Sequence, residues 1–188
     1  MNTPARHILT ALLMLAVMLP GAFAQQYRPL EQGSKIEFKL IVKSNEDEPV
    51  RVAVAGLTGA ISFDKSLPAL SSFDVTFNTP TLNTLSAGYK EKLKSPAYFN
   101  VSKFPFIHLV SKKITQAKNE HVYFDMTADL TINGQTQTVT IPFASYGSST
   151  GYTFRGGFTL SPADFGIGKA DEFSNEAEVF IEIKTVKK

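Results

Sequence analysis

The stretch VYFDMTADLTINGQTQTVTIPFAS, residues 122–145, alternates apolar and polar side chains on both sides of the dipeptide Asn133-Gly134. In a β-strand every second side chain points to the same face, so this alternation indicates two strands that each have one apolar face. Asn-Gly tolerates the positive φ angles of a tight turn between antiparallel strands. The stretch therefore predicts a β-hairpin with one buried face.

The same period of two recurs along most of the chain after residue 24. Apolar side chains alternate within residues 36–42, 50–54, 61–63, 73–77, 107–111, 152–160 and 179–183. About eight or nine strands result, and an antiparallel run of that many strands removes its exposed edges most simply by closing on itself. We therefore expect one all-β domain, with no linker or internal repeat.

Residues 85–93 depart from this alternation. Leu85, Tyr89 and Leu93 are spaced at i, i+4 and i+8, which places them on one face of a helix. Ser95-Pro96 ends the pattern, because the residue before a proline disfavours the helical conformation. The sequence predicts one short helix near residues 85–95, lying across one end of the β structure.

The N-terminal segment has the layout of a secretory signal. Arg6 and His7 precede an apolar run from Ile8 to Leu19, and Ala22-Phe23-Ala24 provides a small-residue cleavage site. The run is short for a bilayer span and polar residues follow it, so we expect a signal peptide over residues 1–24 that is cleaved. The expected mature domain is residues 25–188, with no transmembrane anchor.

Composition excludes several kinds of site. The chain has no cysteine, which rules out disulfides, thiolate metal sites and a lipidated cysteine. Cleavage removes Arg6 and lowers the formal net charge from +2 to +1, so neither a nucleic acid nor an anionic membrane is indicated as a partner.

The sequence contains no recognisable catalytic or metal-binding motif. The two histidines of the mature chain, His108 and His121, have no partner at metal-ligand spacing, and we expect the first on an outward strand face and the second in a loop. The carboxylates alternate with apolar residues, which indicates that they face solvent and not a cleft. We therefore expect no catalytic residue and no metal, which weakens an enzymatic function without eliminating it.

The expected interior is rich in large apolar side chains. A barrel of about eight strands is just wide enough to be packed solid or to hold one slender ligand. Periodicity alone leaves a filled core and a ligand cavity equally open.

Residues 81–114, TLNTLSAGYKEKLKSPAYFNVSKFPFIHLVSKKI, resemble a block of the YceI-type polyisoprenoid-binding, lipocalin-like family. In that family a threonine is followed nine positions later by Leu-Lys-Ser-x-x-Phe-Phe-Asp-Val-x-Lys-Tyr-Pro, which Thr84 and residues 93–105 match in register. Residues 128–139 are similar to the family's Gly-x-Leu-Thr-Ile-x-Gly-x-Thr hairpin, and residues 164–168, DFGIG, to its Asp-Phe-Gly-Ile turn. The likeness extends over residues 27–185.

The resemblance implies an eight-stranded antiparallel lipocalin-like β-barrel in the periplasm, holding an isoprenoid lipid such as a quinone or polyprenyl lipid and no cofactor. Expected partners are this lipid and a membrane donor or acceptor protein, and self-association into a homodimer stays open. The expected lining residues are Phe38, Leu40, Val54, Phe77, Leu109, Phe124, Met126, Phe143, Phe154, Phe158 and Ile181. The candidates for the mouth of the barrel, as a plug or a gate, are Tyr89, Lys92, Tyr98 and Phe99.

Several polar positions depart from the family pattern. Tyr89, Lys90 and Lys92 stand where the family often carries Arg, Asp and His, while Asn100 replaces an Asp and Pro162 an Arg. Burying one methylene is worth about 0.8 kcal/mol and a neutral hydrogen bond about 1 kcal/mol, so a long tail outweighs one polar contact. The departures should alter headgroup selectivity more than affinity.

Three functions remain open at this point. The leading one is a periplasmic carrier for an isoprenoid lipid. The second is a non-binding stress or interaction module with a packed core, and the third is a quinone- or lipid-linked enzyme with titratable groups converging at the barrel mouth.

Overall fold

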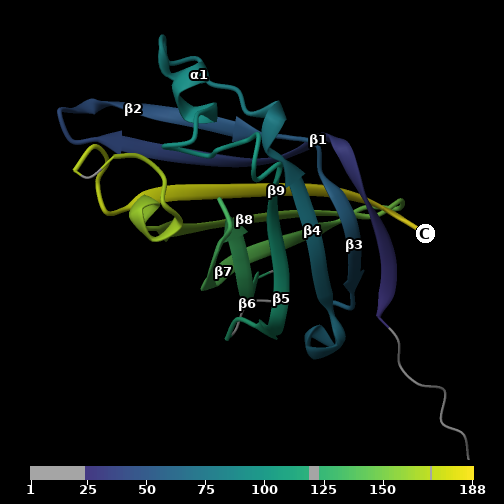
Figure 1. Cartoon of the computed structure of the whole chain (residues 1–188). Coiled ribbons are helices and arrows are strands. Elements are labelled where there is room, and N and C mark those ends of the chain that lie inside the picture. The colour runs from purple at the N-terminus through teal and green to yellow at the C-terminus, as the bar shows by residue number, and fades with distance from the viewer. Residues whose placement is uncertain (1–23, 119–122, 170) are drawn as a thin grey trace, which may run out of the picture.

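The computed structural model describes residues 24–118, 123–169 and 171–188, which form nine antiparallel strands, one short α-helix and three 3-10 turns (Figure 1). The predicted signal segment, apart from Ala24, lies outside the described residues, as do His121 and Val122. The strands are β1 (Gln25–Val42), β2 (Asn45–Val54), β3 (Thr58–Phe63), β4 (Ser72–Asn78), β5 (Phe106–Gln116), β6 (Tyr123–Ile132), β7 (Gln135–Gly147), β8 (Tyr152–Leu160) and β9 (Ala177–Lys187).

Eight of these strands close into a barrel, as predicted. The order runs from β3 through β9, and β1 completes the ring by pairing with β9 on one edge and with β3 on the other. Strand β2 lies outside the ring, because it pairs with the C-terminal half of β1, from Ile36 to Val42. In Figure 1 this β1–β2 pair projects at one end of the barrel, beneath the helix α1 (Tyr89–Lys94).

The β6–β7 hairpin forms where the opening stretch predicts it. Its register runs from Tyr123 opposite Ala144 to Ile132 opposite Gln135. The two turn residues between the strands, Asn133 and Gly134, have φ angles of 51° and 75°. Positive φ at both positions is the geometry of a two-residue turn that matches strand twist.

The core is the inward face of the barrel. Along β6 the side chains alternate between buried and more exposed positions, as the period of two requires. Toward the β3–β4 and β7–β8 turns, the core is an aromatic cluster centred on Phe63, whose ring meets the rings of Phe124, Tyr152 and Phe154 at centroid distances of 5.4, 5.1 and 4.9 Å. Each such edge-to-face pair adds about 0.5–1.5 kcal/mol beyond area burial.

The helix is shorter than predicted. It covers residues 89–94, and Gly88 before it adopts a left-handed conformation with φ of 76°, which separates Leu85 from the helix. Leu85 is fully exposed, so the prediction that it shares a helical face with Tyr89 and Leu93 is wrong. Leu93 is buried and Tyr89 partly buried.

Two long connections cover one end of the barrel. The β4–β5 connection (residues 79–105) contains η2 (Thr79–Thr81) and α1, and the β8–β9 connection (residues 161–176) contains η3 (Pro162–Phe165). The Gly168 N–H donates to the Ala97 carbonyl at 3.0 Å, which joins the two connections directly. We refer to these two segments together as the end cover. The third 3-10 turn, η1 (Pro68–Leu70), belongs to the β3–β4 connection.

Candidate functional site

The predicted lining residues are nearly all buried, although Val54 belongs to β2 and therefore lies outside the ring. Ten of the eleven are at most 7% exposed and belong to one continuous apolar cluster. Phe158 differs, because it is only partly buried and packs against this cluster from the wall. The alternation of the strands was therefore sufficient to find buried positions, but it did not distinguish the strands of the ring from β2.

A small apolar cavity of about 20 Å³ lies within this cluster. That volume holds about one water-sized molecule, so it is smaller than one isoprene unit. Five predicted lining residues surround it, namely Leu109, Met126, Phe143, Phe154 and Ile181. Four further residues line it that were not predicted to do so, namely Phe73, Ile141, Gly156 and Ile183.

The remaining predicted lining residues, apart from the partly buried Phe158, are buried away from this cavity. Phe38, for example, packs against the end cover, where its ring meets that of Phe99 at 5.5 Å. Gly156 was missed although it occupies an inward position of β8 between Phe154 and Phe158. A glycine that interrupts a row of aromatic residues is the sequence signal that could have located the cavity.

Two of the four predicted mouth residues, Lys92 and Tyr98, contact one carboxylate, that of Glu172. Its Oε1 pairs with Lys92 Nζ at 2.5 Å, and its Oε2 accepts hydrogen bonds from the Tyr98 hydroxyl at 2.6 Å and from the Lys169 N–H at 3.2 Å. Lys92 Nζ also lies 4.9 Å from the ring centroid of Tyr89. Glu172 thus joins the two connections of the end cover through side chains.

This contact cluster, defined as Glu172, Tyr98 and Lys92, shifts the acidity of its members. Burial by itself would raise the pKa of Glu172, but the hydrogen bonds from Lys92, Tyr98 and Lys169 N–H outweigh it and lower the pKa below its usual value. The hydrogen bond to Glu172 raises the pKa of Lys92. Burial, followed by the hydrogen bond to Glu172, raises the pKa of Tyr98. The cluster is therefore an ion pair at neutral pH.

Beneath this cluster the cover is apolar. Tyr98 and Phe99 are 2% and 1% exposed, and the ring of Phe173 lies 6.2 Å from that of Tyr98. Asn100, which follows, has a φ of 44°. Asparagine and aspartate are enriched in this left-handed conformation, so the replacement of the family's Asp by Asn100 preserves the turn.

Among the described residues, titratable groups do not converge inside the barrel. Within residues 24–118, 123–169 and 171–188, the buried polar side chains other than tyrosines are all serines and threonines. No group of three or more histidine, aspartate or glutamate side chains in these ranges could hold a metal ion. His108 faces outward, as predicted, and its Nε2 lies 2.7 Å from a carboxylate oxygen of Asp74. None of the described helices is long and apolar enough to cross a membrane.

Comparison with known proteins agrees with the family resemblance seen in the sequence. A UPF0312 protein of Pectobacterium carotovorum is 29% identical over 189 residues, covering 95% of each chain, and one of Pseudomonas aeruginosa is 34% identical over 137 residues, covering 69% of this chain and 70% of that one.

Solved structures share the fold. Burkholderia cenocepacia BcnA superposes with a TM-score of 0.71 at 20% identity, covering 80% of this chain and 94% of that one. A polyisoprenoid binding domain from Saccharophagus degradans superposes with a TM-score of 0.66 at 12% identity, covering 86% and 98%. The family model of the YceI-like domain matches residues 27–186, and this chain therefore belongs to the YceI-like family.

Proposed function

We propose that this protein is a periplasmic carrier that binds a long-chain isoprenoid lipid, either a polyprenyl lipid or an isoprenoid quinone, inside the barrel. The observation that carries the proposal is the continuous apolar inward face of a closed barrel in a YceI-like chain. The Saccharophagus degradans domain of the same fold, described as polyisoprenoid binding, supports the ligand class. The signal-like residues 1–24 support export.

The physical chemistry favours a tail site. Each buried methylene contributes about 0.8 kcal/mol, so several isoprene units exceed the association cost of about 4–15 kcal/mol. Because the cavity holds only about 20 Å³, the tail has to displace side chains. Met126 lines the cavity, and its unbranched thioether side chain adapts to irregular spaces more readily than a branched residue.

The polar groups of the interior support binding without chemistry. Acid–base catalysis requires a titratable group within hydrogen-bond reach of the reacting atom. Among the described residues, the hydrogen bonds of the buried serine and threonine hydroxyls go to backbone groups, and none goes to a carboxylate or a histidine. The buried Tyr98 hydroxyl contacts the Glu172 carboxylate, but this contact belongs to the end cover. A lipid-linked enzyme is therefore the least supported of the three functions.

Native mass spectrometry of protein purified without detergent tests the proposal, with geranylgeraniol and a long-chain quinone added in turn. We expect a one-to-one lipid adduct. The variant I141W fills the cavity and should abolish the adduct, whereas T140W places the same side chain on the exposed neighbouring position and should not. Circular dichroism checks that both variants fold, because overpacking a core costs about 1–3 kcal/mol.

The small size of the cavity favours a second candidate function, a non-binding module with a packed core. That function predicts apo protein in every lipid arm of the same experiment. Uptake of neither lipid by the folded wild type would therefore reject the carrier and leave the packed module.

A further inference from the structure

The backbone pairing between β7 and β8 covers only part of each strand. Their backbone pairing runs from Gly147–Tyr152 to Phe143–Gly156, and among the described residues it does not continue beyond that pair. Strand β7 goes on toward Gln135 paired with β6, and β8 goes on to Leu160 paired with β9. Pro142, the next residue of β7, has no N–H to donate. The backbone pairing of the two strands therefore ends at Gly156.

Gly156 lies between an inner and an outer space. It lines the interior cavity together with Ile141 and Phe143, and it also lines an outer groove of about 370 Å³ together with Ile181. A side-chain atom on Gly156 would come within 3.0 Å of Ile141 Cγ2 and of the Pro142 carbonyl oxygen. The missing side chain lets Ile141 and Pro142 of β7 pack closely on Gly156, so that the bare backbone of this residue lies between the interior cavity and the outer groove.

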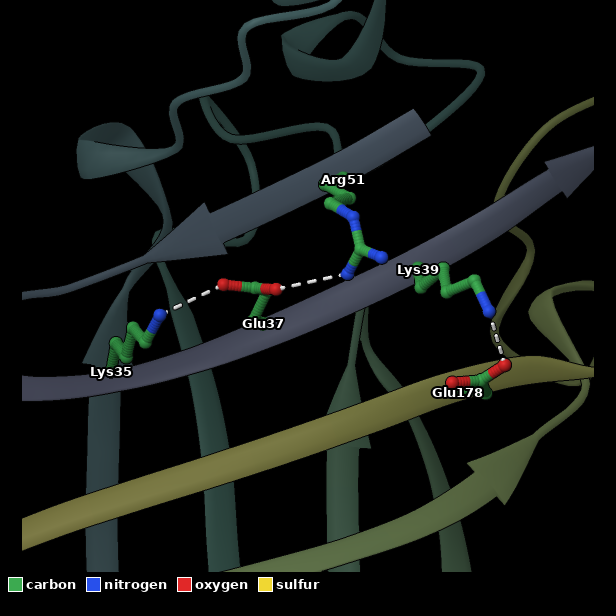
Figure 2. Close-up of polar contacts among 5 residues, drawn as sticks. All are labelled: Lys35, Glu37, Lys39, Arg51 and Glu178. Atoms are coloured by element: carbon green, nitrogen blue, oxygen red, sulfur yellow. Dashed lines mark hydrogen bonds and ion pairs between the residues drawn. The ribbon is translucent and has the colours of Figure 1, made fainter. Parts of the chain in front are cut away.

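The outer groove carries charged side chains from four strands. Its basic residues are Lys35, Arg51 and Arg155, and its acidic residues are Glu37 and Glu182. Figure 2 shows Glu37 between Lys35 and Arg51, with Nζ–Oε2 and Nη1–Oε1 distances of 2.9 and 3.5 Å. The groove thus has one more positive than negative group.

The two arginines hold their carboxylates weakly. Arg51 contacts Glu37 at 3.5 Å and Arg155 contacts Glu182 at 3.3 Å, both longer than the 2.7–2.9 Å typical of charge-assisted hydrogen bonds. Both arginine side chains are more than half exposed. Guanidinium groups carry five donors in a fork that matches phosphate, so an anionic ligand can compete for them.

An apolar surface lies in the same groove. Phe180 is 45% exposed, because it lies at one of the outward positions of β9, which alternate with buried positions. Its register partner is Gly157, which adds no side chain to the outer face. A lipid chain leaving the barrel at Gly156 would therefore contact an aromatic ring before it reached the arginines.

We propose that this groove binds the headgroup of an isoprenoid phosphate, with the phosphate at Arg51 and Arg155 and the tail entering the barrel between β7 and β8 at Gly156. This inference rests on the proposed function, since it requires a tail in the interior. At the end cover, by contrast, Lys92 is held at 2.5 Å by Glu172. The outer groove therefore offers an anion the more accessible cations.

Affinity measurements with geranylgeranyl phosphate and geranylgeraniol test the headgroup, because these probes share one tail. Wild type should bind the phosphate at least about tenfold more tightly, and R51Q/R155Q should remove that preference while leaving affinity for the alcohol unchanged. K65Q/K113Q removes two exposed lysines outside the groove and should keep the preference. Inorganic phosphate at millimolar concentration should not displace the lipid.

Several outcomes would overturn the inference. Equal affinity for both lipids, or a preference that survives R51Q/R155Q, rejects the headgroup site but leaves the tail site standing. Displacement by inorganic phosphate indicates a free-anion site instead of a headgroup site. Binding of neither lipid rejects the proposed function together with the inference.

Photo-crosslinking tests the position of the chain independently of variants. A geranylgeranyl phosphate with a diazirine on the isoprene unit next to the phosphate should label peptides containing residues 155–158 or 180–182 of the wild-type protein. Labelling confined to residues 89–99 or 165–173 would place the headgroup at the end cover and reject the groove.

Discussion

The carboxylate of Glu172 accepts a hydrogen bond from the hydroxyl of Tyr98 at 2.6 Å, across 74 positions of sequence. Glu172 belongs to the β8–β9 connection and Tyr98 to the β4–β5 connection, and Lys92 pairs with the same carboxylate. One acidic side chain thus holds both halves of the end cover together.

Replacing this carboxylate should loosen the cover. E172Q keeps an oxygen for Tyr98 but removes the charge that faces Lys92. Because Lys92 is 41% exposed and regains water, we expect a loss of only about 1 kcal/mol in the free energy of unfolding. Urea denaturation measures this loss, and hydrogen exchange at the Gly168 amide reports the cover itself. E176Q, at an exposed position nearby, should change neither; equal exchange in E172Q and wild type would refute the role of Glu172.

The same contact makes the cover sensitive to acid. The pKa of Glu172 is lowered in the folded protein, so its contribution to stability is present above the pKa of a free glutamate, about 4.3, and is lost as the pH falls through the folded-state pKa. The difference in unfolding free energy between wild type and E172Q should therefore shrink below about pH 4. Urea titrations from about pH 3 to 7 measure it. A constant difference over that range would show that the charge of Glu172 does not stabilise the cover.

The strands and the cover differ in how far they could be predicted. The β6–β7 hairpin follows from alternation and from Asn133-Gly134, because strand period and turn chemistry are local properties. That β2 lies outside the ring was not predictable from pattern. Its Val50, Val52 and Val54 alternate and are buried like those of a barrel strand.

Long-range contacts account for what sequence reasoning missed. Tyr98 and Lys92 were recognised as mouth candidates, but their partner Glu172 lies 74 and 80 positions away. A single acidic residue in a polar loop has no local pattern that marks it as a partner. The helix was predicted too long because Gly88 adopts a left-handed conformation, so that the helix begins at Tyr89 and leaves out Leu85.

Phe99 should act as a plug of the barrel end. Its side chain is 1% exposed and meets Phe38 inside the core, so F99A should lower the free energy of unfolding by about 3–5 kcal/mol. F106A removes a ring that is 55% exposed and should change it by less than about 0.5 kcal/mol. Urea denaturation compares the two. Unchanged stability of F99A with faster lipid uptake would instead identify a gate.

Ser145 should be dispensable for stability. Its hydroxyl is buried in a residue that is 2% exposed and makes no hydrogen bond within the described part of the chain. Burying an unpaired hydroxyl is unfavourable, so S145A should leave the unfolding free energy unchanged or raise it by up to about 1 kcal/mol. S34A is the contrasting variant, because Ser34 Oγ accepts the Lys184 N–H at 2.9 Å and its loss should cost about 1–3 kcal/mol. Thermal or urea unfolding separates them, and a destabilised S145A would contradict the expectation.

Replacing one aromatic ring beside the cavity with a smaller side chain should distinguish a lipid carrier from a packed module. Phe154 meets the rings of Phe63 and Phe73 at 4.9 Å and lines the cavity, so F154L should cost about 2 kcal/mol of stability while enlarging the space. If the interior binds a tail, less packing has to be displaced, and affinity for geranylgeraniol should rise although stability falls.

Y123L is the control, because Tyr123 is 44% exposed and outside the cavity, and it should leave affinity unchanged. Fluorescence displacement gives the affinities and urea denaturation the stabilities of the same samples. A packed module responds to F154L with the loss of stability alone. Opposite changes in affinity and stability at one inward residue can arise only if the space vacated by the ring is the space that the lipid occupies.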